Sequence, residues 1–239
     1  MHTTEQYRGR DYWIVENTLY VKPSFRLKKC ARLIGEMLGN RPCNLLDVGC
    51  GPGALRDLLK SNVRYYGIDI AIHRPAPYFR EVDTAQERIA FDDQRFDFVV
   101  AMGFFEYMGG RQKLKFEEIR SILKPGGRFI LSYINFGHYG RKVWPNYNNV
   151  QSPAEMKEAL GEFFTIERCF PASHHWRQKQ PGNFSLQRLQ IHINANIPVL
   201  SHMFAVEYFF VCSDPAARGN AQGNEQPTAQ TDSANLAIR

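Results

Sequence analysis

The sequence predicts an α/β fold with a mostly parallel sheet, and three observations lead to this prediction. The short apolar run at residues 45–48 continues into a row of alternate glycines, Gly49, Gly51 and Gly53. Similar runs at 64–69 and 96–102 are separated by segments that can hold helices or loops. Nearly continuous apolar character is typical of strands buried on both faces of a parallel sheet. With 239 residues, the chain is long enough for one large domain with its own core.

The first elements are an aromatic arm and a helix. Residues 1–23 have no clear period but carry Tyr7, Tyr12, Trp13 and Tyr20. We interpret this arm as a strap on the core rather than a lid. Ser24 is a suitable N-cap for a helix that reaches Leu38, where Gly39 stops it. One face is apolar: Leu27, Cys30, Ala31, Ile34, Met37 and Leu38. The other face is typical of a solvated surface and carries Arg26, Lys28, Lys29 and Arg32.

The glycine row follows a predicted strand, and we expect a helix over residues 54–60 after it. Glycines let the backbone approach a ligand closely, and a helix N-terminus offers unpaired N–H groups. The second strand, 64–69, ends in Asp69, where an acid accepts hydrogen bonds from ribose hydroxyls. Gly49-x-Gly51-x-x-Ala54 also fits the loose dinucleotide pattern, so this motif alone leaves a nicotinamide cofactor open.

The next crossover departs from the usual pattern. Only residues 70–77 separate Asp69 from a third strand at 78–83, and Pro75 and Pro77 prevent a regular helix there. We therefore expect the crossover helix to be missing or reduced to a turn. A helix over 111–123 then joins the strand at 96–102 to one at 128–134, with its inward residues Phe116, Ile119, Ile122 and Leu123.

A capping box, Ser152-Pro153-Ala154-Glu155, opens a helix that ends near Gly161. Strands are expected at 163–170 and 204–212. The insertion between them, 171–203, is a candidate cap over the substrate site, and residues 185–194 are a candidate helix within it. Residues 213–239 contain few large apolar residues and predict a disordered tail.

These motifs, in this order, resemble the class I S-adenosylmethionine (SAM) methyltransferase superfamily over about residues 25–212. The resemblance rests on the acid-x-Gly-x-Gly-x-Gly loop at 47–53 and on Asp69. It rests further on FDFVVAM, which matches the family's fourth strand, and on LKPGGRF, which matches its turn into the fifth strand. It implies a Rossmann-like, doubly wound, seven-stranded sheet with an antiparallel last strand and a long insertion before it. It also implies SAM as cofactor and methyl transfer as the activity, in a domain at 24–212.

Ligands of open α/β sheets bind beyond the C-terminal ends of the strands. In the family, an acid lies near the adenine amine of the cofactor, and Asp83 matches that acid in this sequence. The backbone that matches Met102-Gly103 holds the methionine end of the cofactor. The cofactor-binding candidates are Asp47, Gly49, Cys50, Gly51, Gly53, Asp69, Ile70, Asp83, Thr84, Met102 and Gly103.

The same rule selects substrate and catalytic candidates. The substrate-binding candidates are Phe104, Tyr107, Tyr133, Tyr139, Arg141, Trp144, Trp176 and Arg177. Methyl transfer depends chiefly on positioning, so a general base is needed only where the acceptor keeps its proton. The base candidates are His138, His174, His175 and Glu106. Family members with small substrates often carry Glu-His where this chain has Glu106-Tyr107. No metal site is predicted, because adjacent histidines in extended chain point apart.

Charge placement suggests the kind of acceptor. The formal net charge is +6, and the segments 132–154 and 171–203 carry cations and no acid: Arg141, Lys142, Arg177, Lys179 and Arg188. A cationic roof over a cationic sulfonium predicts a small or medium, anionic acceptor, clamped by Arg141 or Arg177. Oxygen is the favoured acceptor atom. In the alternative interpretation, these cations only solvate two exposed loops.

Other functions stay open at this point. An RNA or ribose methyltransferase would use a basic mouth for phosphate, although no Asn-Pro-Pro-aromatic or Pro-Cys signature is present. A non-catalytic SAM-fold binding or scaffold protein is the other alternative. Five scattered cysteines without C-x-x-C predict a cytoplasmic location, as does the absence of a secretory signal or a membrane-length apolar run. The oligomeric state is not predicted.

Overall fold

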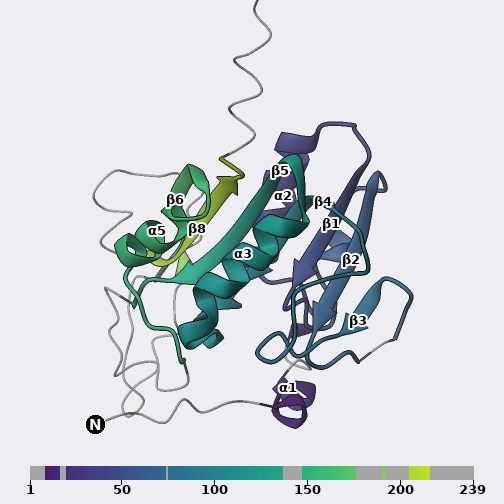
Figure 1. Cartoon of the computed structure of the whole chain (residues 1–239), viewed down its shortest axis with the longest axis horizontal. Coiled ribbons are helices and arrows are strands. Elements are labelled where there is room, and N and C mark those ends of the chain that lie inside the picture. The colour runs from purple at the N-terminus through teal and green to yellow at the C-terminus, as the bar shows by residue number, and fades with distance from the viewer. Residues whose placement is uncertain are drawn as a thin grey trace, which may run out of the picture.

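The computed structural model describes residues 9–16, 20–73, 75–136, 147–175, 190–191 and 205–215. One sheet organises them, with the strand order β3-β2-β1-β4-β5-β8-β6-β7 (Figure 1). The strands are β1 (Cys43–Val48), β2 (Val63–Asp69), β3 (Phe79–Glu81), β4 (Phe96–Met102), β5 (Leu123–Ile134), β6 (Thr165–His175), β7 (Gln190–Ile191) and β8 (Ala205–Ser213).

The pairing confirms the predicted sheet. Strands β3, β2, β1, β4 and β5 pair in parallel, and β8 runs antiparallel to both of its neighbours, β5 and β6. The seven expected strands are present, with the antiparallel last strand inserted between the fifth and sixth. The two-residue β7 adds an eighth strand at the edge, paired antiparallel with the end of β6.

Helices cover both faces of the sheet. The helices are α1 (Arg10–Glu16), α2 (Phe25–Leu38), α3 (Gln112–Ile122) and α5 (Pro153–Gly161). Helix α2 packs on one face through Cys30, Leu33 and Ile34, while α3 and α5 lie on the other (Figure 1). The Ser24 hydroxyl caps α2 by accepting from the Leu27 N–H, as predicted, and Gly39 ends the helix at φ +63°. The Ser152 capping box of α5 is also confirmed.

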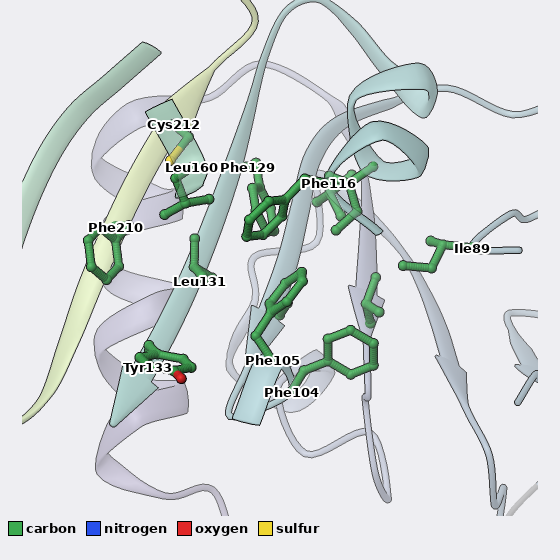
Figure 2. Close-up of a cluster of buried hydrophobic side chains, with 14 of the residues drawn as sticks. Ile89, Phe104, Phe105, Phe116, Phe129, Leu131, Tyr133, Leu160, Phe210 and Cys212 are labelled. Carbon is green, nitrogen blue, oxygen red and sulfur yellow. The ribbon is translucent and has the colours of Figure 1, made fainter. Parts of the chain in front are cut away.

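Aromatic rings fill the core beneath α3 and α5. The Phe116 ring of α3 lies 4.7 Å from the Phe105 ring, and the Phe129 ring of β5 lies 5.3 Å from Phe164. Figure 2 shows Phe104, Phe105, Phe116 and Phe129 gathered between the strands and the helix. Such rings bury large apolar areas in edge-on or tilted pairs, so this cluster fixes α3, and the loop before it, against the sheet.

In the described part of the chain, two crossover connections lack an α-helix: the one between β1 and β2, where a helix was predicted, and the one between β2 and β3, where none was predicted. The helix predicted over residues 54–60 is wrong, because only a 3₁₀ turn, Arg56–Leu58, forms there. Only nine residues, 54–62, separate the glycine turn from β2, which leaves little room for a covering helix and its two connections. Helix α2 already covers this face, where Leu55 packs with Cys30 and Leu33. The described residues between β2 and β3 contain no helix, as the prolines predicted.

The phenyl ring of Phe79 in β3 packs where two glycines lack side chains. A Cβ on Gly53 would lie 2.4 Å from the ring, and a Cβ on Gly67 would lie 2.8 Å from it. Strand β3 spans only three residues, against the six expected at 78–83. Phe79 therefore holds this short edge strand against β2 and the glycine loop.

Strand β6 is longer than predicted. It continues past residue 170 to His175, where His174 and His175 pair with β7. The start of the expected insertion is therefore strand, because β8 and β7 supply backbone partners on its two sides. The predicted helix at 185–194 is wrong at residues 190–191, and its other residues lie outside the described part of the chain.

The termini are described in part. Helix α1 belongs to the predicted arm, and its Arg10 forms an ion pair with Glu81 at 2.6 Å. Of the predicted tail, Ser213 ends β8 and Asp214 forms an ion pair with Arg120 at 3.2 Å; residues 216–239 lie outside the description. Within the ranges that the structure covers, none of the helices has the length and apolar character that a membrane crossing requires.

Candidate active site

A cavity of about 240 Å³ lies at the C-terminal ends of β1, β2 and β4. Its lining comes from the glycine loop, from Asp69-Ile70, from residues 83–85, and from the segment that follows β4. The arm and α2 contribute Trp13, Tyr20, Ser24, Arg26 and Leu27. Most of the predicted cofactor residues line it: Asp47, Gly49, Cys50, Gly51, Asp69, Ile70, Asp83, Thr84, Met102 and Gly103.

The glycine loop and Asp69 are held together by hydrogen bonds. The N–H groups of Gly49 and Cys50 both donate to the Ile68 carbonyl, at 2.9 and 3.1 Å. The Gly51 N–H donates to Asp69 Oδ2 at 2.8 Å, and the Ala71 N–H to Oδ1 at 3.1 Å. Gly49 and Gly51 have φ of +72° and +53°, a region that other residues seldom adopt. The loop therefore fixes the position of the carboxylate at the rim of the cavity.

Gly53 does not belong to the lining of the described cavity. It has φ +78°, and it faces the Phe79 ring as described above. The expectation that it contacts the cofactor stays a prediction, and packing against Phe79 explains why a glycine is required at this position.

Asp47 lies at the floor of the cavity. Its carboxylate is 2% exposed and accepts a hydrogen bond from the Tyr65 hydroxyl at 2.8 Å. Burial raises the pKa of Asp47 to about 7, although the Tyr65 hydrogen bond opposes the rise. A buried acid of this kind suits a positively charged partner, which would restore its ionised form.

Arg26 is a charged residue of the cavity lining that the sequence analysis missed. It was assigned to a solvated face, but it lines the cavity and forms an ion pair with Glu207 of β8 at 2.8 Å. A signal was present in the sequence, because positions 26, 30 and 33 share one side of a helix, and Cys30 and Leu33 are buried. Lys29 also leaves the solvated face, since its Nζ donates to the Ala172 carbonyl at 3.2 Å.

Glu106 lies in a 3₁₀ turn after β4, and its side chain is directed into the site. It is 1% exposed, and Oε1 accepts from the Ile134 N–H at 3.2 Å. Oε2 has no hydrogen-bond partner among the described residues. Burial raises the pKa of Glu106 to about 7, against the opposing effect of the Arg26 guanidinium. Glu106 lines the cavity, so among the predicted bases it is the one that the structure places there.

Aromatic side chains form another wall of the cavity. Trp13 of α1 contacts Tyr107 edge-on at 4.8 Å between ring centroids, and Tyr107 lies 5.1 Å from Tyr147. Phe104 and Tyr107 were predicted for the substrate site and line the cavity, as does Tyr147, which was not predicted.

Tyr133 is placed elsewhere, so its predicted role as a substrate wall is wrong. The side chain is fully buried in the core, and its hydroxyl donates to the Asn149 carbonyl at 2.7 Å (Figure 2). Its neighbour Ile134 lines the cavity instead. Successive residues of a strand point to opposite faces, and the sequence alone left the register at the end of β5 undetermined.

Several predicted residues are not placed. His138, Tyr139, Arg141, Trp144, Trp176 and Arg177 lie outside the described part of the chain. His174 and His175 belong to β6 by their backbone. The base and clamp roles of all these residues stay predictions.

The described residues fit a SAM-sized cofactor on geometric grounds. The glycine loop opens its backbone toward the cavity at Gly49 and Gly51, and the fixed Asp69 carboxylate lies beside it. A buried acid and a guanidinium, Asp47 and Arg26, lie on the same lining. Carboxylates for ribose and ammonium groups and a cation for a carboxylate are the donor and acceptor set that this zwitterionic nucleoside requires.

Comparisons with known proteins identify the family. The family described as "Methyltransferase domain" matches residues 23–175. The N-methyltransferase NodS from Bradyrhizobium japonicum WM9, solved with S-adenosyl-L-homocysteine, has a TM-score of 0.54 at 13% identity, over 85% of this chain and 98% of that one. A comparison with curated proteins finds no match.

Two further solved structures share the fold. The Burkholderia thailandensis 1,6-didemethyltoxoflavin-N1-methyltransferase has a TM-score of 0.56 at 14% identity, over 85% of this chain and 84% of that one. A SAM-dependent methyltransferase from Clostridium acetobutylicum ATCC 824 has a TM-score of 0.57 at 11% identity, over 84% and 96%. At these identities the similarity shows the fold alone. Because the family match spans more than half of the sequence, the chain belongs to the methyltransferase-domain family and is a SAM-dependent methyltransferase.

Proposed function

We propose that this methyltransferase acts on a small or medium molecule that carries a negative group, and that the methyl group is transferred to an oxygen atom. The observation that carries the choice of oxygen is Glu106, a buried carboxyl on the cavity lining whose Oε2 has no partner among the described residues. A hydroxyl keeps its proton at neutral pH, so its methylation needs a base of this kind.

The cofactor roles follow from the lining. Asp69 would accept hydrogen bonds from the ribose hydroxyls, and Asp83 would accept from the adenine amine. Asp47 would pair with the methionine ammonium, and Arg26, which lies against Gly103, with the methionine carboxylate. These four side chains come from four different segments, which together would orient the cofactor along the strand ends.

Bound SAM supplies an electrophilic methyl group on a sulfonium. The chain's own part is to hold the acceptor oxygen in line and to receive its proton at Glu106 Oε2. Glu106 would receive the proton as that oxygen is methylated, and the neutral thioether of the demethylated cofactor would be the leaving group. A pKa of about 7 suits a group that must accept and then release this proton near neutral pH.

The negative group of the acceptor is supported by charge placement in the sequence. Residues 132–154 and 171–203 carry cations and no acid, and Arg141 and Arg177 stay the predicted clamps. A cytoplasmic location also stays a prediction.

The test is a metabolite-extract screen with methyl-labelled SAM, using fractions separated by anion exchange. We expect label in an anionic product as a methyl ether, with loss of labelling in Glu106→Gln and an increased Michaelis constant for the acceptor in Arg141→Ala and Arg177→Ala. Transfer to a nitrogen, as the names of NodS and the toxoflavin enzyme state for those proteins, would overturn the oxygen assignment. Labelled RNA, or no transfer despite SAM binding, would favour the two alternatives.

A further inference from the structure

We propose that Glu207 is the positioning residue for Arg26: it holds the guanidinium against Gly103, so that Arg26 can take an anionic group in the cavity. This inference rests on the proposed function, in which that group is the carboxylate of the cofactor. It adds a residue outside the cavity lining, and a strand far away in sequence, to the binding machinery.

The geometry of Glu207 suits a fixed anchor. It lies in β8, opposite Ile134 of β5 and Ser173 of β6, so its backbone is held on both sides by the sheet. It is 6% exposed, and its Oε1 lies 2.8 Å from Nε of Arg26. An arginine side chain loses much rotamer freedom when it is ordered, and an ion pair to a rigid strand offsets that cost before any ligand binds.

Gly103 supplies the second half of the arrangement. It follows β4 with φ +71°, and a Cβ added there would collide with Nη1 of Arg26. The guanidinium thus has its Nε beside Glu207 and its Nη1 against the backbone at Gly103. This is the segment predicted to hold the methionine end of the cofactor.

The surrounding charges make the anchor necessary. Arg26 also lies in the field of Glu106, so two carboxyl groups compete for one guanidinium. If Glu207 were neutral, the arginine would turn toward Glu106, away from Gly103 and toward the proposed base. Glu207 therefore keeps the cation at the cofactor end of the cavity and leaves Oε2 of Glu106 for the acceptor.

Calorimetry with two probes tests the proposal: S-adenosylhomocysteine and its decarboxylated analogue. Against wild type, we expect Arg26→Ala to weaken binding of the first probe by about 10- to 100-fold, as for loss of a hydrogen bond between charged groups. Glu207→Gln should weaken it by about 5- to 10-fold. Neither substitution should change binding of the decarboxylated probe by more than about twofold.

A double-mutant cycle separates positioning from simple structural support. In an Arg26→Ala background, Glu207→Gln should have no further effect on affinity. Gly103→Ala tests the same contact from the other side and should also discriminate against the carboxylate-bearing probe. Glu167→Gln is the matched control, because Glu167 pairs with Arg128 at 2.9 Å within the same sheet; it should leave both affinities unchanged.

The outcomes distinguish the positioning role of Glu207 from the assignment of the cofactor. Additive effects in the cycle, or equal weakening of both probes by Glu207→Gln, would overturn the positioning role while leaving the cofactor assignment intact. If Arg26→Ala leaves the affinity for S-adenosylhomocysteine unchanged, Arg26 does not take the cofactor carboxylate and the proposed role of Glu207 is overturned, while binding of the probe by wild type keeps the methyltransferase assignment. Failure of wild type to bind the first probe would overturn both proposals.

Discussion

At the scale of single residues, two carboxyl groups of the cavity ionise near neutral pH for related reasons. Asp47 and Glu106 are both buried, and burial raises both pKa values to about 7. Their compensating partners differ: a neutral hydroxyl, Tyr65, at Asp47 and a cation, Arg26, near Glu106. These partners could not be predicted from the sequence, because they come from β2 and α2 and meet the acids only in the folded chain.

The raised pKa of Glu106 has a consequence for stability. A carboxyl group whose pKa is higher in the folded state than in the unfolded state contributes its full stability at pH values below its unfolded-state pKa. That contribution is lost as pH rises through about 7. Glu106→Gln should therefore stabilise the ligand-free protein relative to wild type by about 3 kcal/mol at pH 8 and by about 1 kcal/mol or less at pH 5. Thermal unfolding at both pH values measures the difference, and a gain independent of pH would contradict the assignment.

Asp69 both stabilises the glycine loop and lines the cavity, so its substitution should affect both. Its carboxylate accepts hydrogen bonds from the N–H groups of Gly51 and Ala71, and it lines the cavity. Asp69→Ala should weaken SAM binding by about 1–3 kcal/mol through the lost ribose contacts and loosen the loop as well. Asp69→Asn, which keeps an acceptor for Gly51, should lose less. Equal SAM affinities for both folded variants and wild type, measured by calorimetry, would remove Asp69 from the site.

At the scale of elements, patterns with several supporting signals were predicted correctly. Helix α2 had an N-cap, an apolar stripe and a glycine stop, and α5 had a capping box. The segment at 54–60 had only a local resemblance to a helix, and the short connection between the glycine turn and β2 holds only a 3₁₀ turn. The extension of β6 depended on pairing with β7 and β8, which are distant in sequence, so no local pattern could reveal it.

The contacts of helix α1 with the rest of the chain include an ion pair and an aromatic pair of different strength. The Arg10–Glu81 ion pair is exposed on both sides, and exposed ion pairs contribute little. The edge-on contact of Trp13 with Tyr107 closes part of the aromatic wall. Trp13→Ala should therefore weaken S-adenosylhomocysteine binding several-fold, whereas Arg10→Ala should change it by less than about twofold. Equal effects in calorimetry would show that the ion pair contributes as much as the aromatic contact and would contradict this ranking.

At the scale of the whole molecule, the glycine row and the succession of strand motifs, through their resemblance to a known superfamily, were sufficient to predict the fold. The strand-end rule selected most of the residues that line the cavity. The substrate side was predicted less well. It depends on which face each side chain takes at the end of β5, where Tyr133 turned into the core, and on the loops that carry Arg141 and Arg177.

The C-terminal segment separates into a structural part and a remainder. Ser213 pairs with Arg128 and Thr165, and Asp214 pairs with Arg120, so a truncation that removes them should lower the melting temperature. Truncation after residue 215 should leave both the melting temperature and SAM affinity unchanged, because the remaining composition buries little apolar surface. A fall of several degrees in the second truncation would show that the segment docks.

The place of β8 in the sheet also bears on how the protein matures. It follows every other described strand in sequence, yet it lies between β5 and β6. While the chain is being synthesised, β5 and β6 must each keep an unpaired edge until β8 arrives, and such edges invite aggregation. The same strand carries Glu207 to Arg26. Among the described strands, the one made last therefore both closes the sheet and carries the anchor of Arg26, so a chain without it would present neither a finished sheet nor an anchored arginine.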